Sequence, residues 1–311
     1  MIRYLTTRLG QSLLTVFLTI TAVFVLIRLA PGDPAYSYAG PLASGEELDR
    51  VRTQMGLDQP LIVQYAKFLG DIVTGNVGTS YSFRQPAVDV VLQRLPNTIT
   101  LALASIVLAA VISIPLGVWM ARRADTGREL GVNMLTIAGQ SMPDFWIGIV
   151  LLTVFAVTFP VLPAAGFDSW GGIVLPATTI AILQVALLSR MVRREMSGAL
   201  SSSWFTVARS RGVSRNGLVW GYALRNSAVP VVTALGTRFA SMLNGVVVVE
   251  VVFGWPGIGS LVVRALETRD YPLIQATVLV TAVLAVAVQL LVDLCYPLLD
   301  PRVRLGRKVS A

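Results

Sequence analysis

The chain has 311 residues, of which 54% are hydrophobic and 14% charged, and its formal net charge is +8. Soluble domains carry about 25% charged residues, so this composition excludes an ordinary soluble protein and predicts an integral membrane protein. The chain contains no histidine and one cysteine, Cys295, which excludes Ser–His hydrolysis, histidine metal sites and an intrachain disulfide.

Six segments are long and apolar enough to cross a bilayer as helices, which takes about 20 residues each. None of them alternates in the way that a membrane β-barrel requires. We therefore expect an all-α membrane protein with six transmembrane helices. The fifth segment contains Arg238 and Glu250, and Asp144 beside Pro143 could mark a break in the third. The segments are 9–29, 98–120, 132–159, 173–189, 229–253 and 273–294.

The connections between these segments differ in their content of basic residues. Most of the arginines lie at the two termini and in the connections near 122–128 and 190–225. Because basic residues concentrate on the cytoplasmic side, we expect both termini in the cytoplasm of a bacterial cell and a multi-pass inner-membrane location. The first segment is too long for a signal-peptide core and is predicted to remain as an uncleaved helix. The positive charge reflects this asymmetry, so no nucleic-acid partner is expected.

Four regions follow from this pattern: a cytoplasmic N-terminus with the first helix (1–30), an extracytoplasmic segment (31–96), a five-helix core (97–299) and a cytoplasmic tail (300–311). In the extracytoplasmic segment, "SGEELDRVRTQMGL" predicts a helix with Ser44 as N-cap, ended by Gly56. "VQYAKFLGDIV" predicts another helix, and "GNVGTSYS" a turn and a strand. The segment either caps a pathway or meets a partner outside the membrane.

The connection at about 195–226 contains the basic stretch "SSSWFTVARSRGVSRNG". Ser203 is the expected N-cap of a short helix from Trp204 to Arg211, and Gly212 fits the left-handed position that ends it. Ser214 then caps a second short helix that ends before Pro230. Apolar residues recur at helical spacing and must be buried, partly on the chain's own helix ends and partly on a docked cytoplasmic partner. They are Trp204, Phe205, Val207, Leu218, Val219 and Trp220.

Several motifs in order along the chain resemble one family of membrane permeases. They are "LAPGDP", "GLDQPLIVQYAKFLGDIVTGNVGTSY", "RLPNTITLALAS", "SMPDFWIGIVLL", "VVVEVVFGWPGIGSL", "RDYPLIQ" and "LLVDLCYPLLDPRVR". Together with "TVARSRGVSRNGLVWGYALRNSAVPVVTALG", they resemble the B-type permease of dipeptide, oligopeptide and nickel ABC importers. Gly212 matches the glycine of the coupling loop of ABC importers in general, but of the Glu-Ala-Ala positions before it only Ala208 keeps that general pattern.

The resemblance implies a type I ABC importer permease fold and a set of partners. These are a second homologous permease, two ATPase subunits, an extracytoplasmic substrate-binding protein and the lipid membrane. It also implies that a coupling helix, consisting of Ser203, Trp204, Phe205, Thr206, Val207, Ala208, Arg209 and Arg211 and followed by Gly212, docks on an ATPase. The chain has no GxxxxGK[ST] loop, so ATP and Mg²⁺ are expected in the partner ATPases and no cofactor or catalytic residue in this chain.

Polar residues of the fifth segment are the candidates for the translocation pathway. Gly236, Ala240 and Asn244 recur at a spacing of four residues, with Arg238 and Ser241 beside them. This face either lines a cavity or allows close helix packing. Trp255, in the turn "FGWPGIGS", is expected to be an interfacial anchor.

Two other classes remain open from the residues: a secondary transporter and a membrane scaffold without transport. Neither needs a coupling loop. No residue selects among dipeptide, oligopeptide, nickel complex or opine as the substrate.

Overall fold

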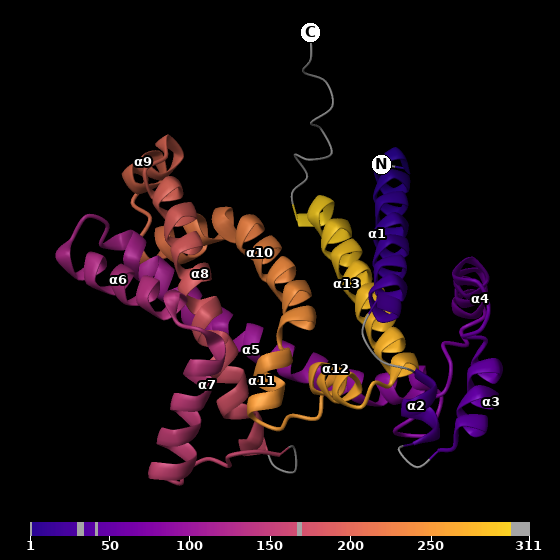
Figure 1. The fold of residues 1–311 in the computed structure, drawn as a ribbon. Coiled ribbons are helices and arrows are strands. Elements are labelled where there is room, and N and C mark those ends of the chain that lie inside the picture. Colours follow the sequence, from indigo (N-terminus) through magenta and orange to yellow (C-terminus); the bar gives the residue numbers. More distant parts are fainter. Residues whose placement is uncertain (1, 30–33, 41–42, 167–169, 300–311) are drawn as a thin grey trace. The chain divides into compact units, whose positions relative to one another are not determined.

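The computed structural model describes residues 2–29, 34–40, 43–166 and 170–299, which are almost entirely helical (Figure 1). Within these residues the only β pairing is an isolated bridge between Thr79 and Pro86. The prediction of a strand in "GNVGTSYS" is therefore wrong. The chain divides into two compact units, one of residues 1–98 with 256–286 and the other of residues 99–255 with 287–311.

Four helices in the described part of the chain are long and apolar enough to span a membrane: Thr6–Leu29, Ala87–Arg122, Gly171–Leu200 and Tyr271–Val292. They belong to α1 (Ile2–Leu29), α5 (Ala87–Arg122), α8 (Val174–Leu200) with the 3-10 turn before it, and α13 (Tyr271–Leu299). A fifth span is possible if a bent helix pair counts as one. The all-helical class is confirmed, whereas the count of six spans stays a prediction.

The bent pair is the third predicted segment, divided into α6 (Gly127–Ser141) and α7 (Asp144–Leu152) with a bend of 98°. Met142, which precedes a proline, has φ −85° and ψ 136°, because the proline ring disfavours helical geometry in the preceding residue. The Asp144 carboxylate then accepts the N–H of Phe145 at 2.9 Å. The break suspected at Asp144 is thereby confirmed.

The fifth predicted segment is not one continuous helix. It consists of α10 (Leu224–Gly245) and α11 (Val247–Val252), which are separated at Val246. Pro230 lies inside α10 instead of starting a new helix. Trp255, the expected interfacial anchor, is only 2% exposed, because its chain segment turns back at positive φ in Gly254. That expectation was wrong.

The first unit contains α2 (Pro34–Ala39), α3 (Gly45–Met55), α4 (Leu61–Val73) and α12 (Ile258–Glu267) beside α1. Ser44 accepts the N–H of Glu47 at 3.3 Å and Gly56 ends α3 at φ 68°, so the predicted caps are confirmed. α4 confirms the helix predicted in "VQYAKFLGDIV".

Buried polar contacts join motifs of the first unit that lie far apart in sequence. Asp270 is completely buried and accepts hydrogen bonds from the Ser80 hydroxyl at 2.6 Å and the Ser82 N–H at 2.9 Å. Its other oxygen accepts the N–H of Leu273 and caps the first turn of α13. In the same unit, Asn97 donates to the Pro256 carbonyl. "GTSY" is thus joined to "RDYP", and "RLPN" to "WPGI".

The second unit is built around α8, which packs against α6, α7 and α10. A core of small and branched side chains joins α5, α8 and the helix that forms the second half of the 195–226 loop. Its fully buried members include Val118, Val192, Met196, Val219 and Ala223. At Gly117, α5 approaches the backbone of α8 so closely that no side chain fits between them. This core supports the loop that contains the candidate site.

Candidate functional site

The candidate helix follows directly from the end of α8. α9 (Ser203–Ser210) starts after a turn in which the Ser201 N–H donates to the Ser197 carbonyl. Its N-cap is Ser202, with φ −73° and ψ 151°, so the expected cap at Ser203 is wrong by one residue. The Ser202 hydroxyl donates back to the Ala199 carbonyl at 2.6 Å and does not cap a backbone N–H of α9. The serine therefore closes the end of α8.

Gly212 ends the candidate helix as predicted. Arg211 is the C-cap residue, and Gly212 follows with φ 80°, a conformation that costs a β-carbon-bearing residue about 1–2 kcal/mol. Ser214 accepts the N–H of Gly217 at 3.2 Å and caps the next helix, as expected. That helix is a π-helical stretch, η3 (Gly217–Ala223), and it continues without interruption into α10. The prediction of a separate second helix at this point is therefore wrong.

The apolar residues of the loop fall into two groups. Leu218 and Val219 are each 2% exposed and pack inside this chain. Trp204, Val207 and Trp220 are 37%, 50% and 45% exposed. The Trp204 and Phe205 rings meet edge to face, with centroids 6.0 Å apart. The expectation that the chain's own helix ends bury part of this surface is confirmed, and an apolar part is left uncovered by the chain.

The exposed face of α9 also carries positive charge. Arg209 and Arg211 are exposed, and α9 contains no acidic residue. Thr206 is exposed and Ala208 is half-buried. α9 thus presents a short, preformed helix whose surface combines apolar side chains with arginines, a surface suited to a partner with an apolar groove and acidic residues.

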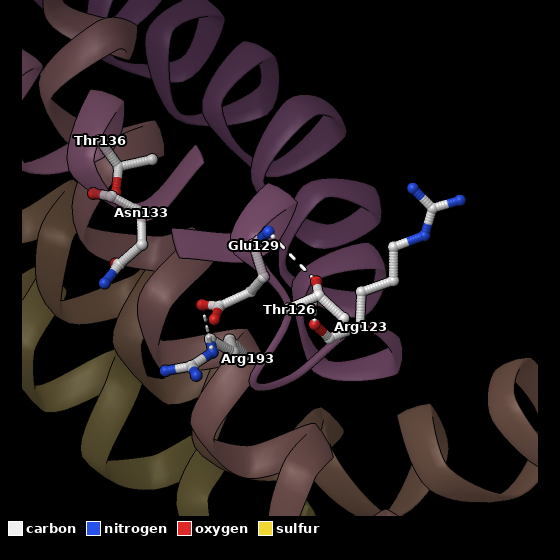
Figure 2. Close-up of polar contacts among 6 residues, drawn as sticks. All are labelled: Arg123, Thr126, Glu129, Asn133, Thr136 and Arg193. Carbon is white, nitrogen blue, oxygen red and sulfur yellow. Dashed lines mark hydrogen bonds and ion pairs between the residues drawn. The ribbon is translucent and has the colours of Figure 1, made fainter. Parts of the chain in front are cut away.

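A buried ion pair fixes the helix that leads into α9. Figure 2 shows the Glu129 carboxylate of α6 pointing toward the Arg193 guanidinium of α8, with Oε1 and Nε 2.9 Å apart. The Glu129 side chain is 6% exposed and that of Arg193 is 32% exposed. The Thr126 hydroxyl accepts the Glu129 N–H at 3.4 Å and caps α6. Sequence reasoning missed this pair, although Thr126 and Glu129 have the spacing of a capping box.

Replacing Glu129 by glutamine should destabilise the packing of α6 on α8, because Arg193 then loses its partner in a mostly buried site. We expect a loss of about 2 kcal/mol, less than for a fully buried pair because Arg193 is partly exposed. Thermal unfolding of the detergent-solubilised protein measures this. Glu195→Gln is the matched control, since its partner Arg194 is 76% exposed and such pairs contribute about 0–1 kcal/mol. Equal losses in the two variants would contradict a special role of the buried pair.

The predicted pathway residues lie on α10. Arg238 and Ser241 are exposed, and the Ser241 hydroxyl donates to the Arg238 carbonyl at 2.8 Å. Gly236 faces Val292, whose Cγ2 lies 2.7 Å from the position of an added β-carbon. Close packing is thus present at Gly236, while lining of a pathway by Arg238 and Ser241 stays a prediction. The Asn244 side chain lies outside the described part of the structure. Among the described residues, no group of carboxylate and thiol side chains is placed to hold a metal ion.

The fold defines a class: a helical membrane protein with several spans joined by short helices. The structure resembles a methionine ABC transporter solved in inward-facing conformations, with a TM-score of 0.57 over 68% of this chain and 96% of that one, at 13% identity. It also resembles a solved amino acid ABC transporter, with a TM-score of 0.52 over 67% of this chain and 93% of that one, at 15% identity. At such identities the likeness shows the fold alone.

The family follows from sequence. Residues 113–305 match the binding-protein-dependent transport system inner membrane component family, and residues 1–102 match the N-terminal region of such membrane components. The glutathione transport system permease protein GsiC of Escherichia coli K12 is 36% identical over 98% of this chain and 99% of its own length. A Brucella abortus relative, provisionally named a peptide transport system permease protein, is 37% identical over 96% of this chain and 97% of its own length. The chain belongs to this family and is a permease subunit of a binding-protein-dependent ABC importer.

Proposed function

We propose that the chain is the B-type permease of an importer for peptides or a related small solute, and that α9 transmits ATP-driven motion to it. The observation that carries the proposal is the exposed apolar and basic surface of α9 at the end of α8. A helix that is already folded loses less conformational entropy on docking than a loop does. The glutathione and peptide transporter names of the relatives support a peptide-class substrate.

The proposal assigns each part of the assembly a task. Two ATPase subunits bind ATP and Mg²⁺ and receive α9, a second homologous permease completes the pathway, and a substrate-binding protein delivers solute from outside. Both termini and the 195–226 loop face the cytoplasm. Arg238, Ser241 and Asn244 are the proposed lining of the pathway, and the 31–96 segment is the proposed extracytoplasmic region. A secondary transporter or scaffold has no use for a preformed helix that leaves apolar surface exposed.

Reversing the charge of Arg209 and Arg211 together to glutamate should leave membrane insertion intact and abolish import. Reversed charge at a docking surface repels an acidic partner. The chain is expressed with its genomic neighbours, extracted gently, and the co-purifying proteins are identified by mass spectrometry. We expect two ATPases and a second permease with the unaltered chain and loss of the ATPases with the double variant. Substrate-dependent ATPase activity should be lost in parallel.

The matched control is the pair Arg50→Glu and Arg128→Glu, which changes the net charge equally at exposed positions on other helices. That control should retain the ATPases. Normal substrate-stimulated ATPase activity in the Arg209 and Arg211 variant would count against α9 as the coupling helix. A chain that purifies alone would favour a secondary transporter or scaffold.

A further inference from the structure

A cavity of about 420 Å³ lies in the second unit where the end of α5 meets the helix that begins at Arg215, in the second half of the 195–226 loop. Three arginines and two tryptophans account for most of its lining: Trp119, Arg122, Arg123, Arg215 and Trp220. None of the described residues that line it is acidic. It is distinct from the α9 surface and from the proposed pathway residues on α10.

The three arginines have no carboxylate partner that the described residues supply. The Arg123 guanidinium lies 4.9 Å from the centre of the Trp119 ring, and Figure 2 shows it pointing away from the Glu129–Arg193 ion pair. Stacking of a guanidinium on an indole orients its N–H groups without satisfying them. Arginine binds phosphate with two parallel N–H donors and keeps its charge at any ordinary pH. The cavity therefore has the chemistry of an anion site.

The cavity lies at the end of an apolar helix, and this position indicates which kind of anion it binds. α5 is apolar enough to span the membrane and ends at Arg122, so Arg122 and Arg123 lie at the end of the candidate span. The remaining wall, Pro115 and Val118, belongs to that helix itself. Tryptophan is enriched at the level of lipid headgroups, where one side of the ring is apolar and the other wet. Trp220 is 45% exposed, so one part of its ring lines the cavity and another part is accessible to lipid headgroups or water.

We propose that this cavity binds the phosphate of an anionic phospholipid from the cytoplasmic leaflet. The proposal rests on the cytoplasmic orientation of the 195–226 loop in the proposed function. Basic pockets between membrane helices on that side suit anionic headgroups, and each arginine near the surface strengthens binding about fivefold. A soluble acidic partner is less suited, because Pro115 and Val118 place the wall of the cavity within the bilayer-spanning helix. A bound lipid joins α5 to Arg215 and Trp220, and so holds the second half of the loop at the membrane surface.

The test is lipid retention by the full chain, purified with whatever partners accompany it. The delipidated protein is titrated with phosphatidylglycerol or phosphatidylcholine in mixed micelles, and bound lipid is counted by native mass spectrometry. We expect one tightly held phosphatidylglycerol and no comparable phosphatidylcholine. The triple variant Arg122→Gln, Arg123→Gln and Arg215→Gln should weaken its retention about 100-fold. Arg128→Gln, Arg194→Gln and Arg225→Gln remove the same charge from exposed positions outside the cavity and should retain the lipid.

Each other outcome overturns the lipid assignment. Equal retention in both triple variants means that general surface charge, not the cavity, attracts the lipid. Displacement of phosphatidylglycerol by inorganic phosphate at comparable concentration assigns the site to a free anion. If the lipid is lost only when ATPases are bound, the three arginines of the cavity contact the ATPases and not a lipid. Because the readout is lipid on this chain, it stands apart from the co-purification of ATPases that tests the proposed function.

Discussion

Replacing Gly212 by valine should uncouple ATP hydrolysis from import while the chain still inserts in the membrane. Gly212 has φ 80°, and no atom of the described residues lies within 4 Å of the position of an added β-carbon. The penalty is therefore conformational, roughly 1–3 kcal/mol for a branched residue at positive φ. The loop avoids this penalty by turning differently after Arg211, which changes the direction in which α9 points. Reconstituted transport together with substrate-stimulated ATPase activity measures the effect.

Gly212→Asn is the matched control for this prediction, because asparagine tolerates the left-handed conformation better than any branched residue. The asparagine variant should keep most of its coupling, and alanine should fall between the two. Full coupling in the valine variant would show that the angle set at Gly212 does not matter. Failure of the asparagine variant as well would point to a need for the bare backbone at a partner surface.

Replacing Gly117 by alanine should strongly destabilise the second unit, although the change adds only one methyl group. An added β-carbon would lie 2.5 Å from Cβ of Val192 and 2.6 Å from the Ser189 carbonyl oxygen. The oxygen belongs to the backbone of α8, so relief requires α5 and α8 to separate. Overpacking of this kind costs typically about 1–3 kcal/mol, and the core beneath the candidate site would open with it. The melting temperature and the yield of monodisperse protein report the loss.

Gly198→Ala, on α8, is the matched control. In the described part of the chain, no atom outside its own helix turn lies within 4 Å of its added β-carbon, and alanine is favoured over glycine in a helix by about 1 kcal/mol. The control should therefore be neutral or slightly stabilising. Equal stability of the Gly117 and Gly198 variants would contradict the close approach of the two helices.

The features that the sequence predicted correctly depend on neighbouring residues. Ser44 and Gly56 bound α3, Gly212 ends α9 and Pro143 breaks the third segment, because caps, left-handed turns and prolines act through their own backbone. The N-cap of α9 was misplaced by one residue for a related reason. Ser201, Ser202 and Ser203 are equally able to cap, and only the end of α8 decides among them.

The features that were missed depend on residues far apart in the chain. Glu129 and Arg193 are separated by 64 positions, and Ser80 and Asp270 by 190. Hydrophobic periodicity carries no information about such pairs. Trp255 was misjudged for the same reason, because its composition suits a membrane surface while tertiary packing buries it. Long-range pairs such as Glu129 with Arg193 therefore became visible only in the folded structure.

The unbroken helix that begins at Arg215 has a mechanical consequence. From Arg215 through η3 to Gly245 the backbone is helical without a gap, and it ends at the break at Val246. Such a rod is roughly 40 Å long, so a tilt of only about 5° displaces its far end by about 3–4 Å. Arg238 and Ser241 lie in its distal third. If α9 moves as proposed, a small rotation of the loop would therefore shift this part of α10 by a few ångströms, while the break at Val246 separates α10 from α11.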